Sequence, residues 1–209
     1  MNWHDCPQLL PGDVVCVKGK KSKISFLIRV MSTLRGEPPT VANHVAMMMD
    51  DHVLVEAIHP CVTERLLLYH YGQWPERYEV ALFRRNDWTA MLGAKLRWAA
   101  QHYLGKRYSI GKLVCHAVDW FLTQAWWLFG GHGEAYLARR LTGDRYPICS
   151  WLVAWIYERA GRGFITPPAK AQPDDIWDEC MSDPAWRVVF FTDGLAGVIG
   201  DRLHGSPHD

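Results

Sequence analysis

Strand-like segments are gathered at the start of this chain, and helix-like segments follow them. Short runs rich in β-branched and apolar residues, bounded by turn residues, predict strands over 14–17, 41–49, 53–58, 62–68, 78–84 and, near the end, 186–191. Consecutive strands joined by short turns pair antiparallel, whereas strands that alternate with helices pair parallel. The order of segments therefore predicts an α+β fold with an antiparallel sheet.

Helical patterns dominate the rest of the sequence. Residues 88–104 carry one apolar stripe, with Asp87 as the expected N-cap and Gly105 as the stop. A second helix is expected from Pro147 to about residue 160, because proline suits a first helical turn. A short third helix is expected over 174–180.

The segment 111–145 reads as a helical insertion rich in tryptophan. Its first part, 111–129, is strongly apolar, but four polar residues interrupt it: Lys112, His116, Asp119 and Gln124. These interruptions favour a buried or interfacial helix over a membrane span. We expect a single domain over 1–200 that contains this insertion, and a polar, flexible tail over 201–209.

The net charge and the cysteine spacing argue against a nucleic-acid-binding protein and against a zinc protein. The formal net charge of +1 gives no electrostatic case for nucleic-acid binding. Six cysteines occur without a CxxC pair or zinc-ligand spacing. An even number of cysteines is compatible with three disulfides. We favour free thiols in a reducing compartment, because the chain is long enough to be stabilised by a hydrophobic core without disulfides. The N-terminus lacks a signal-peptide pattern, so we expect a cytoplasmic protein, or one that leaves the cell by a non-classical route.

Cys149 is the candidate nucleophile, because it is the cysteine that falls at a clear helix start. Unpaired N–H groups and the helix dipole stabilise a thiolate there, and a nearby imidazolium does the same. From position alone, a small buried residue in a first turn is the alternative.

His44 and Glu56 lie on two strands joined by the turn at 50–52. With a three-residue loop, position 44 pairs with 58 and 46 with 56, so His44 and Glu56 become diagonal neighbours on one face. A two-residue loop would place them on opposite faces. His44 is then the candidate base and Glu56 the residue that orients it. A core histidine is the alternative interpretation.

The order of these pieces resembles the permuted papain-like cysteine hydrolases. These include the circularly permuted relatives of NlpC-type cell-wall peptidases and, more distantly, the lecithin:retinol acyltransferase group. As in that group, the His strand precedes the Cys helix, and the resemblance covers roughly residues 11–191. The matching pieces are Pro11-Gly12-Asp13-Val14-Val15, Asn43-His44-Val45-Ala46, Val55-Glu56-Ala57, Pro147-Ile148-Cys149-Ser150, and Thr166-Pro167-Pro168 with Asp174.

The resemblance implies a papain-like core, in which the Cys-bearing helix packs against a small barrel-like sheet. It also implies a triad of Cys149, His44 and Glu56, an acyl-enzyme, and neither metal nor cofactor. The segment Lys106-Arg107-Tyr108 resembles a family segment that carries a tyrosine near the site. Tyr108 and Ser150 are therefore candidate oxyanion or substrate contacts.

Three functions follow as hypotheses. The first is an amidase or peptidase that acts on cell-wall peptides or isopeptide-like amides. The second is a thiol-dependent lipid acyl hydrolase or acyltransferase at a membrane surface, for which 111–129 and the basic loop 18–23 are the candidate peripheral membrane contacts. The third is a non-catalytic binding module on the same scaffold. The expected partner is a peptide or acyl-containing substrate.

Overall fold

The computed structural model describes residues 3–20, 41–108 and 147–204, and its strands form one sheet. The strands are β1 (Val14–Gly19), β2 (His44–Met48), β3 (Val53–Ala57), β4 (Val62–Leu66), β5 (Tyr78–Arg85) and β6 (Trp186–Phe191). Their order is β4-β3-β2-β1-β5-β6, and every neighbouring pair is antiparallel. The mixed α/β architecture with an antiparallel sheet confirms that part of the sequence prediction.

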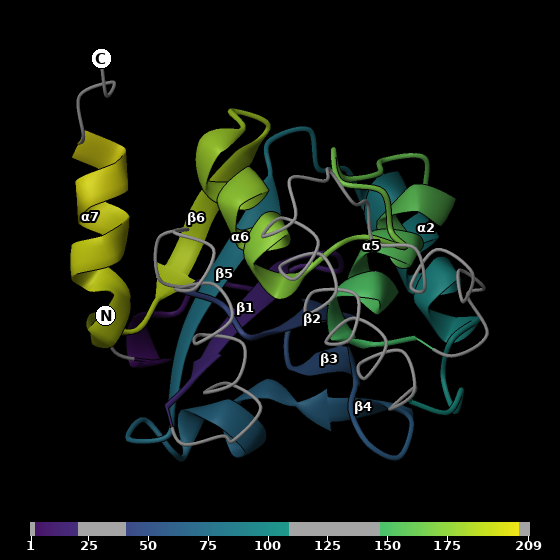
Figure 1. Cartoon of the computed structure of the whole chain (residues 1–209), viewed down its shortest axis with the longest axis horizontal. Helices are drawn as coiled ribbons and strands as arrows, with labels where there is room; N and C mark the ends of the chain where they lie inside the picture. The colour runs from purple at the N-terminus through teal and green to yellow at the C-terminus, as the bar shows by residue number, and fades with distance from the viewer. Residues whose placement is uncertain (1–2, 21–40, 109–146, 205–209) are drawn as a thin grey trace, which may run out of the picture.

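Helices cover the sheet (Figure 1). They are α2 (Ala90–Gln101), α5 (Cys149–Arg159), α6 (Pro173–Ser182) and α7 (Ala196–His204), with short turns η1 (Trp3–Asp5), η2 (Leu68–Gly72) and η3 (Asp193–Leu195). Helix α5 packs against β2, β3 and α2, whereas α6 packs against β6 and β2. Figure 1 shows α2 and α5 at one side of the molecule and α7 at the opposite side.

Both faces of the sheet are buried, so two hydrophobic layers flank it. Side chains alternate between the faces of a strand, and β2 shows this directly. Met47 packs into the layer that contains Leu152 and Ile156 of α5. Met48 packs into the opposite layer, with Tyr71 of η2. Burial on both faces explains why the central strands read as nearly continuous apolar runs in the sequence.

Several sequence predictions need correction at element ends. The strand expected over 62–68 ends at Leu66, and the chain then forms η2, a π-helical turn. The tail expected to be flexible from residue 201 begins with the last turn of α7, which extends to His204. The expected insertion 111–145, with its helix over 111–129, lies outside the described residues. The basic loop expected over 18–23 begins within β1, which includes Lys18 and Gly19, and its residues 21–23 lie outside the described residues.

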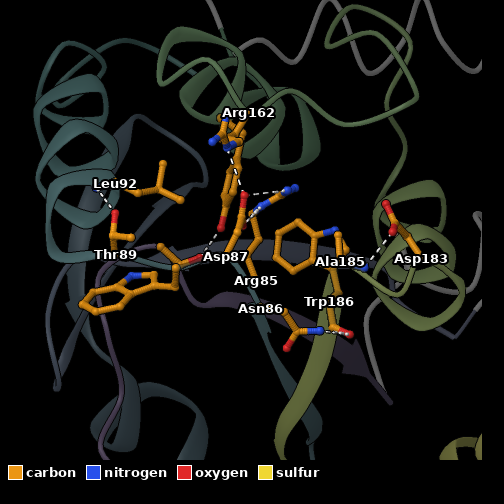
Figure 2. Close-up of polar contacts among 12 residues, drawn as sticks. Arg85, Asn86, Asp87, Thr89, Leu92, Arg162, Asp183, Ala185 and Trp186 are labelled. Atoms are coloured by element: carbon orange, nitrogen blue, oxygen red, sulfur yellow. Dashed lines mark hydrogen bonds and ion pairs between the residues drawn. The ribbon is translucent and has the colours of Figure 1, made fainter.

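Thr89, and not Asp87, is the N-cap of α2. The Thr89 hydroxyl accepts a hydrogen bond from the N–H of Leu92 at 3.1 Å. Figure 2 shows Asp87 between Arg85 and Arg162, whose Nε atoms lie 2.7 and 3.1 Å from its carboxylate oxygens. Asp87 therefore links the end of β5 to the loop after α5 instead of capping the helix.

The Pro-Gly-Asp turn before β1 ties the sheet to the helices. Asp13 is fully buried and accepts two hydrogen bonds of 2.7 Å from the guanidinium of Arg84 on β5. Gly12 has a φ of 96°, and a Cβ there would lie 2.4 Å from a methyl group of Leu96 on α2. Its carbonyl accepts a hydrogen bond from the Tyr157 hydroxyl of α5. The turn thus fixes where α2 and α5 sit on the sheet.

Candidate active site

Cys149 is the first residue of α5, as the sequence predicts. Ile148 precedes it in an extended conformation, which leaves the first N–H groups of the helix directed away from the helix body. The Cys149 side chain is partly exposed, and the N–H of Ser150 donates a hydrogen bond to its sulfur. The helix start thus offers both a dipole and direct donors to a thiolate.

The β2–β3 hairpin has the three-residue loop that the His44–Glu56 hypothesis requires. Met47 pairs with Val55 and Met48 with Leu54. This register confirms the prediction that His44 and Glu56 are diagonal neighbours. His44 Nε2 lies 2.7 Å from Glu56 Oε2, so the two side chains form a hydrogen-bonded pair.

The backbone of β2 also donates to the thiolate. Met48 N–H donates to Asp13 on the β1 side, and Met49 N–H donates to Val53 on the β3 side. Because donors alternate sides along an antiparallel strand, the N–H of Val45 points to the β3 side. There it donates to the sulfur of Cys149. The start of α5 therefore contacts β2 through the sulfur of Cys149.

Two polar side chains hold the segment that leads into His44. One carboxylate oxygen of Asp174, at the start of α6, accepts from the N–H groups of Val41 at 3.0 Å and Ala42 at 3.3 Å. Asn43 pairs with the end of β1 through its side-chain amide, which binds both the N–H and the carbonyl of Gly19. These contacts fix the start of β2 and with it the imidazole.

Cys149 and His44 shift each other's pKa through a hydrogen bond and through their charges. Burial opposes the charge on Cys149, but the hydrogen bond and the charge of His44, with the two backbone N–H groups, lower the pKa of the thiol below its usual value. Burial likewise opposes the charge on His44, yet its hydrogen bonds to Cys149 and Glu56 raise its pKa to about 10. Both shifts act toward a thiolate and an imidazolium, relative to the isolated side chains.

Glu56 is fully buried and remains ionised. Burial opposes its charge, but the hydrogen bond and charge of His44, followed by the hydrogen bond from Tyr71, lower its pKa. The Nε of Arg65 lies 3.3 Å from its second oxygen, Oε1, and His70 Nε2 lies 4.0 Å from the same atom. A buried carboxylate with such partners supports an imidazolium rather than taking up its proton.

The two candidate oxyanion or substrate contacts take different positions. The segment 105–108 runs beside the start of β4, and Tyr108 N–H donates to Pro60 O at 2.9 Å. Burial and then the charge of Cys149 raise the pKa of Tyr108. The Ser150 hydroxyl, in contrast, is buried and donates to the Ala171 carbonyl at 2.7 Å. Ser150 therefore faces the site with its N–H group, not with its hydroxyl.

Cys149 differs from the other buried or partly buried cysteines. Burial raises the pKa values of Cys16 and Cys180, and it raises the pKa of Cys6 to about 11. The cysteines in the described part of the chain are all free thiols. The arrangement can thus activate one thiol selectively.

Sequence reasoning missed three residues around Glu56: Arg65, His70 and Tyr71. Arg65 lies on β4, and the other two lie in η2, a stretch where strand and turn patterns merge. The sequence does contain one signal for these partners: Glu56 lies within an apolar strand. A buried carboxylate requires polar partners, so such a position predicts that some exist.

Comparison with solved structures finds a similar fold in the metalloprotein YiiX from Escherichia coli O157:H7, a DUF1105 protein. The TM-score is 0.57 at 16% sequence identity, and the match covers 88% of this chain and 98% of YiiX. No known family profile matches the sequence. No curated protein matches it either.

The described residues present neither a membrane-spanning helix nor a metal site. None of their helices has both the length and the apolar character needed to cross a membrane. In the same part of the chain, no three His, Cys, Asp or Glu side chains converge as a metal site would require.

Proposed function

We propose that this chain is a cysteine hydrolase that cleaves amide bonds through Cys149, His44 and Glu56. The observation that carries the proposal is the thiol of Cys149 at a helix N-terminus, hydrogen-bonded to an imidazole whose other side binds a buried carboxylate. Because Nε2 of His44 is engaged by Glu56, Nδ1 is the nitrogen left to serve the sulfur.

The first half of the reaction forms an acyl-enzyme. The Cys149 thiolate attacks the amide carbonyl carbon, and the carbonyl electrons move onto oxygen. The N–H groups at the start of α5 are the donors placed to stabilise that oxyanion. As the intermediate collapses, the C–N bond breaks and His44 gives its proton to the leaving amine. A thioester and a neutral imidazole remain.

The second half restores the enzyme. Neutral His44 takes a proton from water, and the oxygen of that water attacks the thioester carbonyl. The C–S bond then breaks, which releases a carboxylic acid and regenerates the thiolate and the imidazolium. Throughout, Glu56 holds the imidazole in place and stabilises its charged form.

The fold assignment that goes with this chemistry is a permuted papain-like domain. It is supported by the order of the elements, since the His-bearing β2 precedes the Cys-bearing α5, and by the packing of α5 against β2 and β3.

The similar structure, YiiX, is described as a metalloprotein. In this chain His44 interacts with both Cys149 and Glu56.

Cell-wall peptides or isopeptide-like amides are the proposed substrate class. The test is release of free amines from soluble peptidoglycan fragments, together with a mass increase on Cys149 from the trapped acyl-enzyme. Wild type is expected to show both, and Cys149→Ser neither. Amine release that survives Cys149→Ser contradicts the proposal.

A lipid acyl substrate is the second candidate, because large apolar side chains are exposed around β4 and η2. Leu66, Leu68 and Trp74 are 55%, 50% and 42% exposed, respectively. Binding to phosphatidylcholine or phosphatidylglycerol vesicles that is lost in Leu68→Asp, with thioester formation on Cys149 from the lipid, favours this candidate over the amidase. A Cys149 that reacts no faster than a free thiol favours the non-catalytic binding module.

A further inference from the structure

Tyr71 and His44 share one oxygen of Glu56. The Tyr71 hydroxyl donates to Glu56 Oε2 at 2.6 Å, and His44 Nε2 lies 2.7 Å from the same atom. His44 comes from β2 and Tyr71 from η2, so two separate elements meet at a single carboxylate oxygen. The contact is buried, because Glu56 is fully buried and Tyr71 is 4% exposed.

The Tyr71 ring has little freedom to turn away. Its edge-to-face contacts with His70 and Tyr78 have centroid distances of 4.8 and 5.1 Å. Burial, followed by the charge of Glu56, raises the pKa of Tyr71 well above its usual value. The phenol therefore stays protonated at neutral pH, and it acts toward the carboxylate as a donor.

The second oxygen of Glu56 is held from the opposite direction. Arg65 Nε lies 3.3 Å from Oε1, and Arg65 Nη1 lies 3.0 Å from Nδ1 of His70. Burial lowers the pKa of His70, so its neutral ring is available to accept from the guanidinium. Oε1 has no hydrogen-bond partner within the described residues, so the hydrogen bonds that orient the carboxylate are the two at Oε2.

We propose that Tyr71 is a positioning residue of this site, which acts on Cys149 through Glu56 and His44. The inference rests on the proposed function and adds to it a group outside the triad. When His44 gives up its proton, Glu56 loses its nearest cation and needs another donor to keep its orientation. Tyr71 supplies that donor on the same oxygen, so the imidazole returns to the geometry that regenerates the thiolate.

The test is the pH dependence of Cys149 alkylation by iodoacetamide in Tyr71→Phe, from pH 5 to 9. The substitution keeps the packed ring and removes only the hydroxyl. We expect the acid limb of the rate profile to move up by about one pH unit, a roughly tenfold loss of rate at pH 6, while the rates converge at pH 9. Tyr69→Phe, which alters the exposed neighbour in η2, is expected to match wild type.

A double-mutant cycle with Glu56→Gln separates positioning from packing. If Tyr71 acts through Glu56, Tyr71→Phe has no further effect on the pH profile once Glu56→Gln is present. Additive shifts, or a lower rate at all pH values without movement of the acid limb, overturn the inference. Wild-type Cys149 that shows no dependence on His44 refutes the proposed function itself. A wild-type profile in Tyr71→Phe, with His44 dependence intact, refutes only the role of Tyr71.

Discussion

His44 and Glu56 bind each other diagonally across the β2–β3 hairpin. Their atoms Nε2 and Oε2 lie 2.7 Å apart, although continuing the Met47–Val55 and Met48–Leu54 pairing would place residue 58, not Glu56, opposite His44. Diagonal neighbours on one sheet face lie within reach of long side chains. The length of one turn, 50–52, therefore decides whether the imidazole has a carboxylate partner.

Replacing Glu56 with glutamine tests what that partner does. Glu56→Gln keeps the shape and removes the charge that helps to raise the pKa of His44 to about 10. A lower pKa for His44 reduces the fraction of imidazolium. The thiolate then loses part of the positive charge that stabilises it, so the pKa of Cys149 rises. We expect alkylation of Cys149 at pH 6 to slow by about tenfold or more and to recover at alkaline pH.

The control is Glu64→Gln, which changes an exposed glutamate of β4. Its alkylation profile is expected to follow wild type. If Glu56→Gln also follows wild type, Glu56 does not support the imidazolium.

Ser150→Ala separates the hydroxyl of Ser150 from its N–H group. The hydroxyl donates to the Ala171 carbonyl in a buried position, whereas the N–H donates to Cys149. We expect a loss of about 1–3 kcal/mol in the free energy of unfolding, measured in urea. The alkylation profile of Cys149 should not move. A large fall in Cys149 reactivity with unchanged stability would instead assign the hydroxyl to the site.

Asp13→Ala removes one partner of a buried ion pair. Arg84 would keep its charge in the core without the carboxylate that binds it at 2.7 Å. We expect a destabilisation of about 3–5 kcal/mol, measured by chemical denaturation. Glu76→Ala, at the exposed pair with Arg77, is the comparison and should stay within about 0.5 kcal/mol of wild type. Similar small losses for both variants would argue against the buried pair.

Alanine substitutions at two glycines with positive φ compare the cost of backbone strain alone with the cost of strain plus steric overlap. Gly105 has a φ of 77°, and no atom lies within 4 Å of the place that a Cβ would take, so Gly105→Ala should cost about 1–2 kcal/mol from backbone strain. At Gly12 a Cβ would also meet the side chain of Leu96, so Gly12→Ala should cost about 1–3 kcal/mol more. Equal thermal shifts in the two variants would contradict the tight contact between this turn and α2.

Much of the sheet, the contact between His44 and Glu56, and the helix start near Cys149 could be predicted, because local rules decide them. The apolar runs and the turn at 50–52 place β2 and β3, and a period of two then assigns His44 and Glu56 to one face. Pro147 and the apolar run after it place a helix start at Cys149. These features depend on neighbours in sequence or on a single hairpin.

The support around Glu56 could not be predicted, because it depends on contacts between elements. Tyr71 reaches Glu56 only through the π-helical turn of η2, which interrupts what reads as a continuing strand. Asp87 illustrates the same limit. Aspartate is a favourable N-cap residue, but Asp87 is bound by two arginines from separate elements. Thr89 caps α2 instead. At Asp87, charges from other elements override the local preference.

The most direct test of the proposed function is iodoacetamide labelling of each cysteine, followed by mass spectrometry from pH 5 to 9, in wild type and in His44→Ala. In wild type we expect Cys149 to label rapidly near pH 6, where an ordinary thiol of pKa about 8.5 is almost wholly protonated. Cys16 and Cys180 should stay unlabelled in the folded protein, because they are buried. In His44→Ala the labelling of Cys149 at pH 6 should disappear and return only at alkaline pH. Labelling of Cys149 that is slow at pH 6 in wild type, or that is unchanged in His44→Ala, would contradict a thiolate–imidazolium pair at this site.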